Sequence, residues 1–153
     1  MRTSKPHPEL APKGYQGLLQ VVRHVSASGL DHGLLHLIEV RASQLNGCAF
    51  CMDMHATAAL ESGESQRRLN LVATWHEAPW FTPRERAALA WTEALTELGR
   101  HGVDDALYAA TREHFSEQEV VDLTYAIALI NAWNRLGVGL QPDLPPAKTE
   151  VSA

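Results

Sequence analysis

The chain has 153 residues, of which 45% are hydrophobic and 20% are charged, the size and composition of one ordinary soluble domain with a substantial core. Collagen-like, low-complexity and fully disordered classes are therefore excluded. The formal net charge is −5 and the basic residues are scattered, a balance that argues against a nucleic-acid partner.

The two ends of the chain differ in composition from its centre. Residues 1–14 carry three of the eight prolines and no periodic apolar pattern, and three more prolines follow Gly139. We therefore predict an extended N-terminal segment over 1–14, a helical domain over 15–139 and a proline-rich, extended or mobile tail over 140–153. The N-terminal segment lacks the apolar stretch of a secretory signal, so we expect a cytoplasmic protein.

Between these ends, apolar residues recur at the spacing of three to four that is typical of helices. Strand-like alternation is nowhere sustained. The sequence therefore predicts an all-α, single-domain fold of six to seven helices joined by short loops. The longest nearly apolar run, Tyr125–Trp133, is far shorter than the roughly 20 residues that a membrane-spanning helix needs, so no membrane partner is expected.

Capping residues mark where the helices begin and end. Asp31 is placed to cap a helix over 32–45, which ends at the Asn46-Gly47 turn. The next helix runs from about Cys48 to about Leu60. The other predicted helices cover the apolar pattern from Leu18 to Val25, then 65–73 behind Ser65, 83–98 behind a Thr82/Glu85 capping box, 104–115 behind Asp104, and a long helix through Leu136 behind a Ser116/Glu119 capping box.

The residue types that can carry chemistry gather around a CxxC at the N-terminus of a central helix. Cys48, Cys51 and His55 are spaced so that on a helix their side chains share one face. Unpaired backbone N–H groups at a helix N-terminus favour a thiolate, and a neighbouring imidazole can accept the thiol proton. The second cysteine can then resolve a sulfenic acid as a disulfide. The pattern predicts a redox-active thiol pair.

The preceding helix offers further polar groups. His36 and Glu39 share a face, and His32 lies one turn earlier. If the two helices pack antiparallel across the Asn46-Gly47 turn, these groups can reach the cysteine pair and form a proton relay. The structural alternative is a solvated polar face, which we favour for His32.

Two other interpretations of the cysteines stay open from the residues alone. They can be small buried hydrophobic residues, since free cysteine is among the most buried residue types. They can also bind zinc together with His55 and either His32 or His36. Paired zinc motifs normally show a second two-ligand cluster, which this sequence lacks, so the prediction includes neither a metal nor another cofactor.

Two further groups are expected to have structural roles. The four tryptophans, at positions 75, 80, 91 and 133, are predicted to pack in the core and at subunit interfaces, in preference to the alternative of a ligand-binding box. Asn131, Asn134 and Arg135 interrupt an apolar helix. Because buried polar groups need partners, we expect these three to make helix-capping or intersubunit hydrogen bonds.

The segment Ser43-Gln44-Leu45-Asn46-Gly47-Cys48-Ala-Phe-Cys51-Met-Asp-Met-His55 resembles the core motif of the AhpD-like alkylhydroperoxidases in the carboxymuconolactone decarboxylase superfamily. The later stretches Trp75–Trp91 and Ile130–Leu136 resemble peroxidase-related members of that superfamily, so the likeness extends from about Leu18 to Leu136. The resemblance implies an all-helical AhpD-like fold, assembly into a homo-oligomer such as a trimer or hexamer, and reduction of organic hydroperoxides through two thiols.

The resemblance also assigns roles to individual residues. Cys51 is implied to be the peroxidatic thiol that becomes a sulfenic acid, and Cys48 to donate a proton and then resolve it as a Cys48–Cys51 disulfide. His55 is implied to be the base of the relay. A thiol reductant, either a lipoyl-bearing or a thioredoxin-like protein, would return the electrons.

Two positions depart from the pattern of the well-studied peroxidases. His36 stands where those enzymes have a relay glutamate, and Glu39, one turn later, is the nearest carboxylate. Phe50 stands where they have a histidine. These departures leave two alternatives to peroxidase activity: a redox-sensing or thiol-disulfide exchange oligomer without efficient turnover, and a decarboxylase that does not depend on the cysteine pair.

Overall fold

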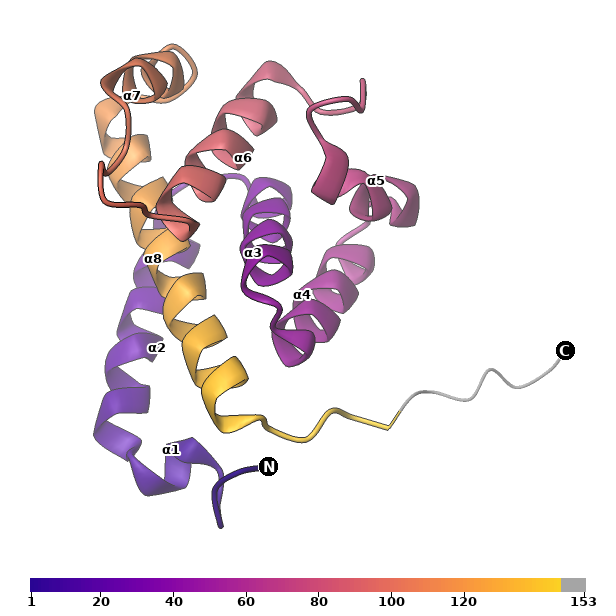
Figure 1. Cartoon of the computed structure of the whole chain (residues 1–153), viewed down its shortest axis with the longest axis vertical. Helices are drawn as coiled ribbons and strands as arrows, with labels where there is room; N and C mark the ends of the chain where they lie inside the picture. Colours follow the sequence, from indigo (N-terminus) through magenta and orange to yellow (C-terminus); the bar gives the residue numbers. More distant parts are fainter. Residues whose placement is uncertain (147–153) are drawn as a thin grey trace, which may run out of the picture.

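The structure of the protein is a computed structural model that describes residues 1–146. Over this range the regular structure consists of eight α-helices and one short 3₁₀-helix, without a strand, so the all-α prediction is confirmed (Figure 1). The α-helices are α1 (His7–Leu10), α2 (Pro12–Ala27), α3 (His32–Asn46), α4 (Ala49–Glu61), α5 (Gln66–Leu71), α6 (Pro83–Thr96), α7 (Asp105–Arg112) and α8 (Glu117–Leu140), and the 3₁₀-helix η1 covers Val72–Thr74.

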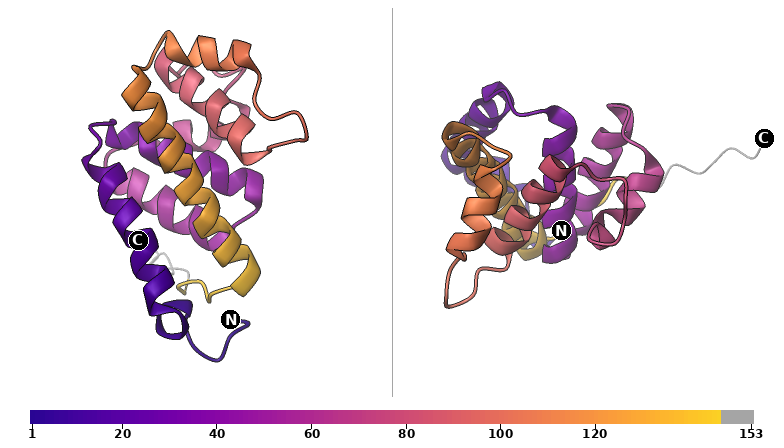
Figure 2. Two further views of the ribbon diagram at one scale, coloured as in Figure 1. Left: turned by 90° about the vertical axis from the view of Figure 1, so that its left-hand side faces the viewer. Right: turned by 90° about the horizontal axis from the view of Figure 1, so that it is seen from above.

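Helix α3 is the centre of the fold, surrounded by α4, α6 and α8 (Figures 1 and 2). It is apolar on two sides because it contributes to two core clusters. Leu34 and Ile38 pack toward α2 and α8, whereas Leu37 and Val40 pack toward α4, α5 and α6. Full burial of one such aliphatic side chain contributes about 1.5–3 kcal/mol. A helix that is apolar on both sides therefore has to lie inside the molecule.

Most of the predicted caps are present. Asp31 accepts a hydrogen bond from the Leu34 N–H at 2.9 Å, and both capping boxes, Thr82/Glu85 and Ser116/Glu119, are formed. The Ser65 hydroxyl makes no capping bond, although Ser65 does occupy the cap position. Helices α6 and α7 end earlier than predicted, and none of the described helices is long and apolar enough to cross a membrane.

The N-terminal segment differs from the extended chain predicted over 1–14. Helix α1 lies within it, and α2 starts before its end. The prolines begin these helices instead of preventing them, since proline is favoured in the first turn, where its missing N–H is not needed. The segment is also held to the end of α8, because the Arg2 N–H donates to the Leu140 carbonyl at 2.9 Å.

Helix α8 runs past its predicted end at Leu136 to Leu140. The glycines at 137 and 139, which resemble a helix terminator in the sequence, lie inside the helix. Residues 141–146 of the predicted tail form no helix, and residues 147–153 lie outside the described residues.

Candidate active site

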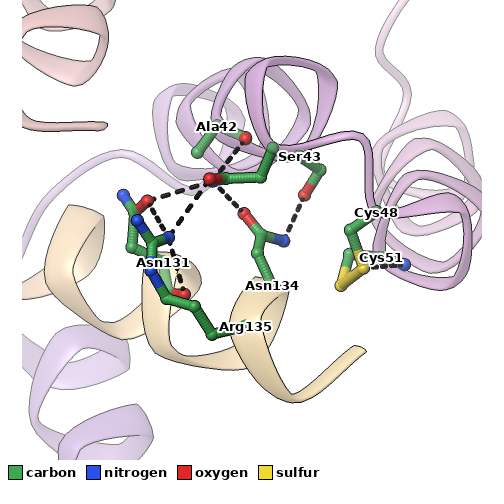
Figure 3. Close-up of a disulfide and its surroundings, with 8 residues drawn as sticks. Ala42, Ser43, Cys48, Cys51, Asn131, Asn134 and Arg135 are labelled. Atoms are coloured by element: carbon green, nitrogen blue, oxygen red, sulfur yellow. Dashed lines mark hydrogen bonds between the residues drawn. A yellow bond between two sulfur atoms is a disulfide. The ribbon is translucent and has the colours of Figure 1, made fainter. Parts of the chain in front are cut away.

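The turn between α3 and α4 sets the position of the cysteine pair. Gly47 closes α3 in the left-handed conformation at φ 65°, where glycine is favoured, and Cys48 then caps α4. The Cys48 sulfur accepts the backbone N–H of Cys51 at 3.3 Å. The two cysteines are joined by a disulfide, which Figure 3 shows in its surroundings. Both are buried, with exposed fractions of 1% and 2%.

Helix α8 covers the disulfide by bringing its backbone close to the sulfur atoms. A Cβ atom added at Gly137 would lie 2.6 Å from the Cys48 Sγ and 3.2 Å from the Cys51 Sγ. Such distances leave no room for a side chain. The glycine is therefore required here for close approach, and this requirement explains a residue whose sequence context predicted a helix end.

Hydrogen bonds bring together the three predicted relay residues. Nδ1 of His55 lies 2.9 Å from Oε2 of Glu39, and Nδ1 of His36 lies 3.3 Å from the same oxygen. One carboxylate thus holds one imidazole from α4 and one from its own helix, as the predicted antiparallel packing of α3 and α4 requires. We call His36, Glu39 and His55 the relay triad.

Within the relay triad, the hydrogen bonds shift the pKa values of Glu39 and His36 in opposite directions. Burial raises the pKa of Glu39, but the hydrogen bonds from His36 and His55 outweigh it and lower the pKa from 4.5 to about 2. The hydrogen bond to Glu39 raises the pKa of His36 above its ordinary value of 6.5, against the opposing effect of burial. Glu39 is therefore a carboxylate near neutral pH and fixes the orientation of both rings.

A cavity of about 770 Å³ opens beside the disulfide. Cys51 and all three residues of the relay triad line it, whereas Cys48 is not among the lining residues. Nε2 of His55 is buried and has no hydrogen-bond partner among the described residues. His32, which we expected on a solvated face, is exposed and also lies on the cavity wall. The cavity is thus lined by one of the two cysteines and by His55, whose buried Nε2 is unpartnered within residues 1–146.

A second part of the cavity wall was not connected to the site by sequence reasoning. His7 and Tyr15 reach it from the N-terminal helices, and Trp133 reaches it from α8. The three rings contact one another, with centroids 5.7–6.2 Å apart. Their positions are too far apart in the chain for any motif to connect them.

Two of the four tryptophans lie in the core, and a subunit contact of the other two stays a prediction. Trp75 and Trp91 are buried in the two core clusters. Trp80 is 38% exposed and lies under the Arg67 guanidinium, 4.2 Å from its ring centroid. Trp133 lines the cavity instead of the core.

A polar network next to the disulfide fixes α8 against the end of α3 (Figure 3). The Asn46 amide donates to the side-chain oxygens of Asn131 at 3.0 Å and Asn134 at 2.8 Å. Asn134 in turn donates to the Ser43 hydroxyl at 3.0 Å, and Arg135 donates to Asn131 at 2.7 Å. We expected helix-capping or intersubunit bonds from these residues. The bonds instead connect two helices of one chain. The sequence contained one indication of this, namely Asn46, which we assigned only to a turn.

No group of three or more His, Cys, Asp or Glu side chains is arranged to hold a metal ion within residues 1–146.

Comparison with known proteins now gives the family. Residues 9–94 match the carboxymuconolactone decarboxylase family. The chain belongs to that family. It is 37% identical to the uncharacterised protein YdfG of Bacillus subtilis over 132 residues, which cover 86% of this chain and 90% of YdfG.

Solved structures give the same fold. A protein of unknown function from Agrobacterium tumefaciens, suggested to be the antioxidant defence protein AhpD, has a TM-score of 0.88 and 39% identity, and the match covers 94% of this chain and 97% of that one. The debrominase Bmp8 has a TM-score of 0.79 at 18% identity, covering 89% of this chain and 73% of its own. At that identity the likeness shows the fold alone. The AhpD-like fold predicted from the motif is therefore confirmed.

Proposed function

We propose that the protein is a thiol peroxidase that reduces organic hydroperoxides through Cys51 and Cys48, with the relay triad moving the proton. One observation carries the proposal: Cys51 lines the cavity beside His55, whereas Cys48 lies behind it. The two sulfurs are thus unequal in the way that a peroxidatic and a resolving cysteine must be. The family and the AhpD-like fold, which includes enzymes, are consistent with this activity.

The first step forms the sulfenic acid. The Glu39 carboxylate accepts a hydrogen bond from Nδ1–H of His55, so Nε2 is the nitrogen left to take the proton of the Cys51 thiol. The Cys51 thiolate attacks the outer peroxide oxygen and the O–O bond breaks. The alkoxide takes the proton back from the imidazolium and leaves as an alcohol.

The second step forms the disulfide. The Cys48 sulfur caps α4 and accepts the Cys51 N–H at 3.3 Å, an environment that stabilises its thiolate. This thiolate attacks the sulfenic sulfur of Cys51, forms the S–S bond and releases the oxygen as water after protonation. Two electrons have then passed from the two thiols to the peroxide.

Restoring the thiols requires an external dithiol. Both sulfurs are buried, and Cys51 alone lines the cavity. The reductant therefore has to reach Cys51 through the cavity, either directly or after the protein opens locally. A lipoyl group on a flexible arm can enter directly, whereas a thioredoxin-like protein needs a larger opening. We propose the lipoyl-bearing class as the donor.

Glu39 is proposed to take the role of the relay glutamate. Its carboxylate reaches His55 from one helical turn beyond the position that His36 occupies. His36 then acts as a second ring on the same carboxylate and steadies it through its own bond to Ser62, 3.3 Å away. The relay is thereby re-routed, and it does not need a histidine at Phe50.

Assembly into a homo-oligomer in the cytoplasm is part of the proposal. Three large apolar side chains of α7 and α8, Tyr108, Val121 and Tyr125, are between 42% and 50% exposed and surround a shallow groove. Contiguous exposed apolar residues of this kind are typical of subunit contacts. Light scattering coupled to size exclusion should therefore give a mass above that of the 16.8 kDa chain.

Steady-state turnover tests the activity. The reduced protein should consume cumene hydroperoxide over many turnovers per subunit when dihydrolipoamide is supplied. A redox sensor, which is the second candidate because Phe50 replaces a histidine, would oxidise once and stop with any dithiol. A decarboxylase would release carbon dioxide equally well with the disulfide intact.

A further inference from the structure

The far end of the cavity has no role in the chemistry above, yet it is built from aromatic rings. His7, Tyr15 and Trp133 come from α1, α2 and α8 and meet there. His7 and Tyr15 pack edge to face with centroids 5.8 Å apart, and Tyr15 and Trp133 do so at 5.7 Å. We call these three residues the aryl subsite.

We propose that the aryl subsite binds an aromatic ring of the substrate, so that the hydroperoxide is an aralkyl one whose ring carries a hydrogen-bonding group. The reactive end of this substrate rests on the proposed function. The binding of the ring does not.

Helix α8 sets the distance between the subsite and the reacting sulfur. Trp133 lies four residues before Gly137, whose backbone touches the disulfide, so the two positions share a face about 6 Å apart along the helix axis. This is a short span. A ring bound at the subsite and a peroxide group at Cys51 can therefore belong to one ligand molecule, since Trp133 and Cys51 line the same cavity.

The wall between the two ends is apolar. It is formed by side chains of α3, α4 and α8 with few hydrogen-bonding groups, namely Leu35, Phe50, Met54, Ile130 and Leu136. A cavity of about 770 Å³ is within the range that holds organic ligands and is far larger than hydrogen peroxide needs. Aromatic ligands gain both burial and edge-to-face contacts in such surroundings.

The hydrogen-bonding group on the substrate ring is inferred from the environment of His7. Its Nε2 is buried and has no hydrogen-bond partner among residues 1–146. Buried polar groups are nearly always paired, and an unpaired one loses free energy that a ligand can restore. A hydroxyl on the ligand ring would supply the missing partner once the His7 ring rotates to turn its buried Nε2 toward the cavity.

The N-terminal segment is held in place to present this ring. Besides its backbone bond, Arg2 donates from its guanidinium to the Gly139 carbonyl at 3.1 Å. Thr3 and Pro6, which follow Arg2, also line the cavity. The aryl subsite is therefore part of the folded molecule and not a chance contact of a loose end.

Binding to the oxidised protein tests the proposal without any turnover. Calorimetry is carried out with three alcohols that match reduced hydroperoxides: tert-butanol, 2-phenyl-2-propanol and 2-(4-hydroxyphenyl)-2-propanol. We expect the phenyl compound to bind at least tenfold more tightly than tert-butanol, and the phenol to bind several-fold more tightly again.

Two variants locate the effect. Trp133→Leu should reduce the preference for the phenyl compound to less than threefold, whereas His7→Phe, which keeps the ring, should remove only the gain from the phenolic hydroxyl. Trp80→Leu is the matched control, since this exposed tryptophan lies outside the cavity, and it should change neither ratio. Circular dichroism melts of each variant verify folding, and His7→Phe gives a second reading if Trp133→Leu fails to fold.

Equal binding of tert-butanol and the phenyl compound by the wild-type protein would overturn the inference, as would an unchanged preference in Trp133→Leu. If His7→Phe still binds the phenol more tightly than the phenyl compound, the proposed hydrogen bond between the phenolic hydroxyl and Nε2 of His7 is wrong. If the aryl preference is present but reduced protein consumes no hydroperoxide, the peroxidase proposal fails and the aryl subsite stands.

Discussion

The two ends of the cavity are built in different ways. At the near end, Cys51, His55 and Glu39 come from two consecutive helices joined by one turn, and their spacing along the chain predicts their contact. At the far end, the rings come from α1, α2 and α8, which no local pattern connects. The residues proposed for the chemistry are thus close in the sequence, whereas the residues proposed to bind the ligand come together only through the tertiary structure.

The strongest loss of activity is expected from replacing Cys51, because the two cysteines at the near end have different proposed roles. Cys51→Ser should abolish hydroperoxide consumption, because the serine hydroxyl cannot become a comparable nucleophile. Cys48→Ser should still react once and stop at the sulfenic acid, which a dimedone adduct on Cys51 detects by mass. Equal loss of the first oxidation in both variants would contradict the assignment of roles.

The next effect concerns the carboxylate of the relay triad. Glu39→Gln keeps the shape but removes the charge that orients His55, and general acid–base steps typically contribute about 10²–10⁴-fold to rate. We expect kcat/KM for cumene hydroperoxide to fall within that range while binding of 2-phenyl-2-propanol stays the same. A matched loss in binding would mean that Glu39 shapes the cavity as a whole and that the two ends are not separable.

A smaller effect is expected where α8 connects the two ends. Gly137→Ala places a methyl group against the sulfurs and should lower the free energy of unfolding of the oxidised protein by about 1–3 kcal/mol. Gly139→Ala meets nothing within 4 Å and should raise it by roughly 0.5–1 kcal/mol, as alanine does in helices. Denaturant titration measures both. An unchanged or raised free energy of unfolding in Gly137→Ala would contradict the requirement for close approach.

A further effect is the pH dependence of stability. The depressed pKa of Glu39, about 2 against 4.5, adds stability that is complete above pH 4.5 and is lost as the pH falls toward 2. The raised pKa of His36 adds stability that is complete below pH 6.5 and is lost as the pH rises through the folded-state value. Thermal melts should therefore show a plateau between these limits, and Glu39→Gln should flatten both flanks. If the wild-type protein and Glu39→Gln show the same dependence of melting temperature on pH, the proposed coupling between Glu39 and His36 is wrong.

Local signals were enough to predict most of the fold. The capping residues Asp31, Thr82 and Ser116 begin their helices as predicted, because a cap and its partner lie within one turn. The same locality made His55 and Glu39 predictable, since only one turn separates their helices. Nothing nonlocal was needed for these contacts.

The errors have a common physical origin. The predicted end of the last helix at Leu136 was too early, because the reason for a glycine at 137, sulfur atoms against its backbone, lies far away in the sequence. Trp133 suggested a core or subunit contact because its partners, His7 and Tyr15, were expected in or beside an extended segment. In each case the fold brings together segments that are distant in the sequence. Helix propensity and capping patterns are local, so they do not predict such contacts.

The peroxidase proposal is tested most simply by the intact mass of reduced protein before and after one equivalent of cumene hydroperoxide, with free thiols trapped by an alkylating agent. We predict the loss of both alkylation sites in the wild-type protein and no loss in Cys51→Ser. If both cysteines of the wild-type protein stay alkylatable while the peroxide persists, the thiol pair is not a peroxidase centre and the account given for the near end is wrong.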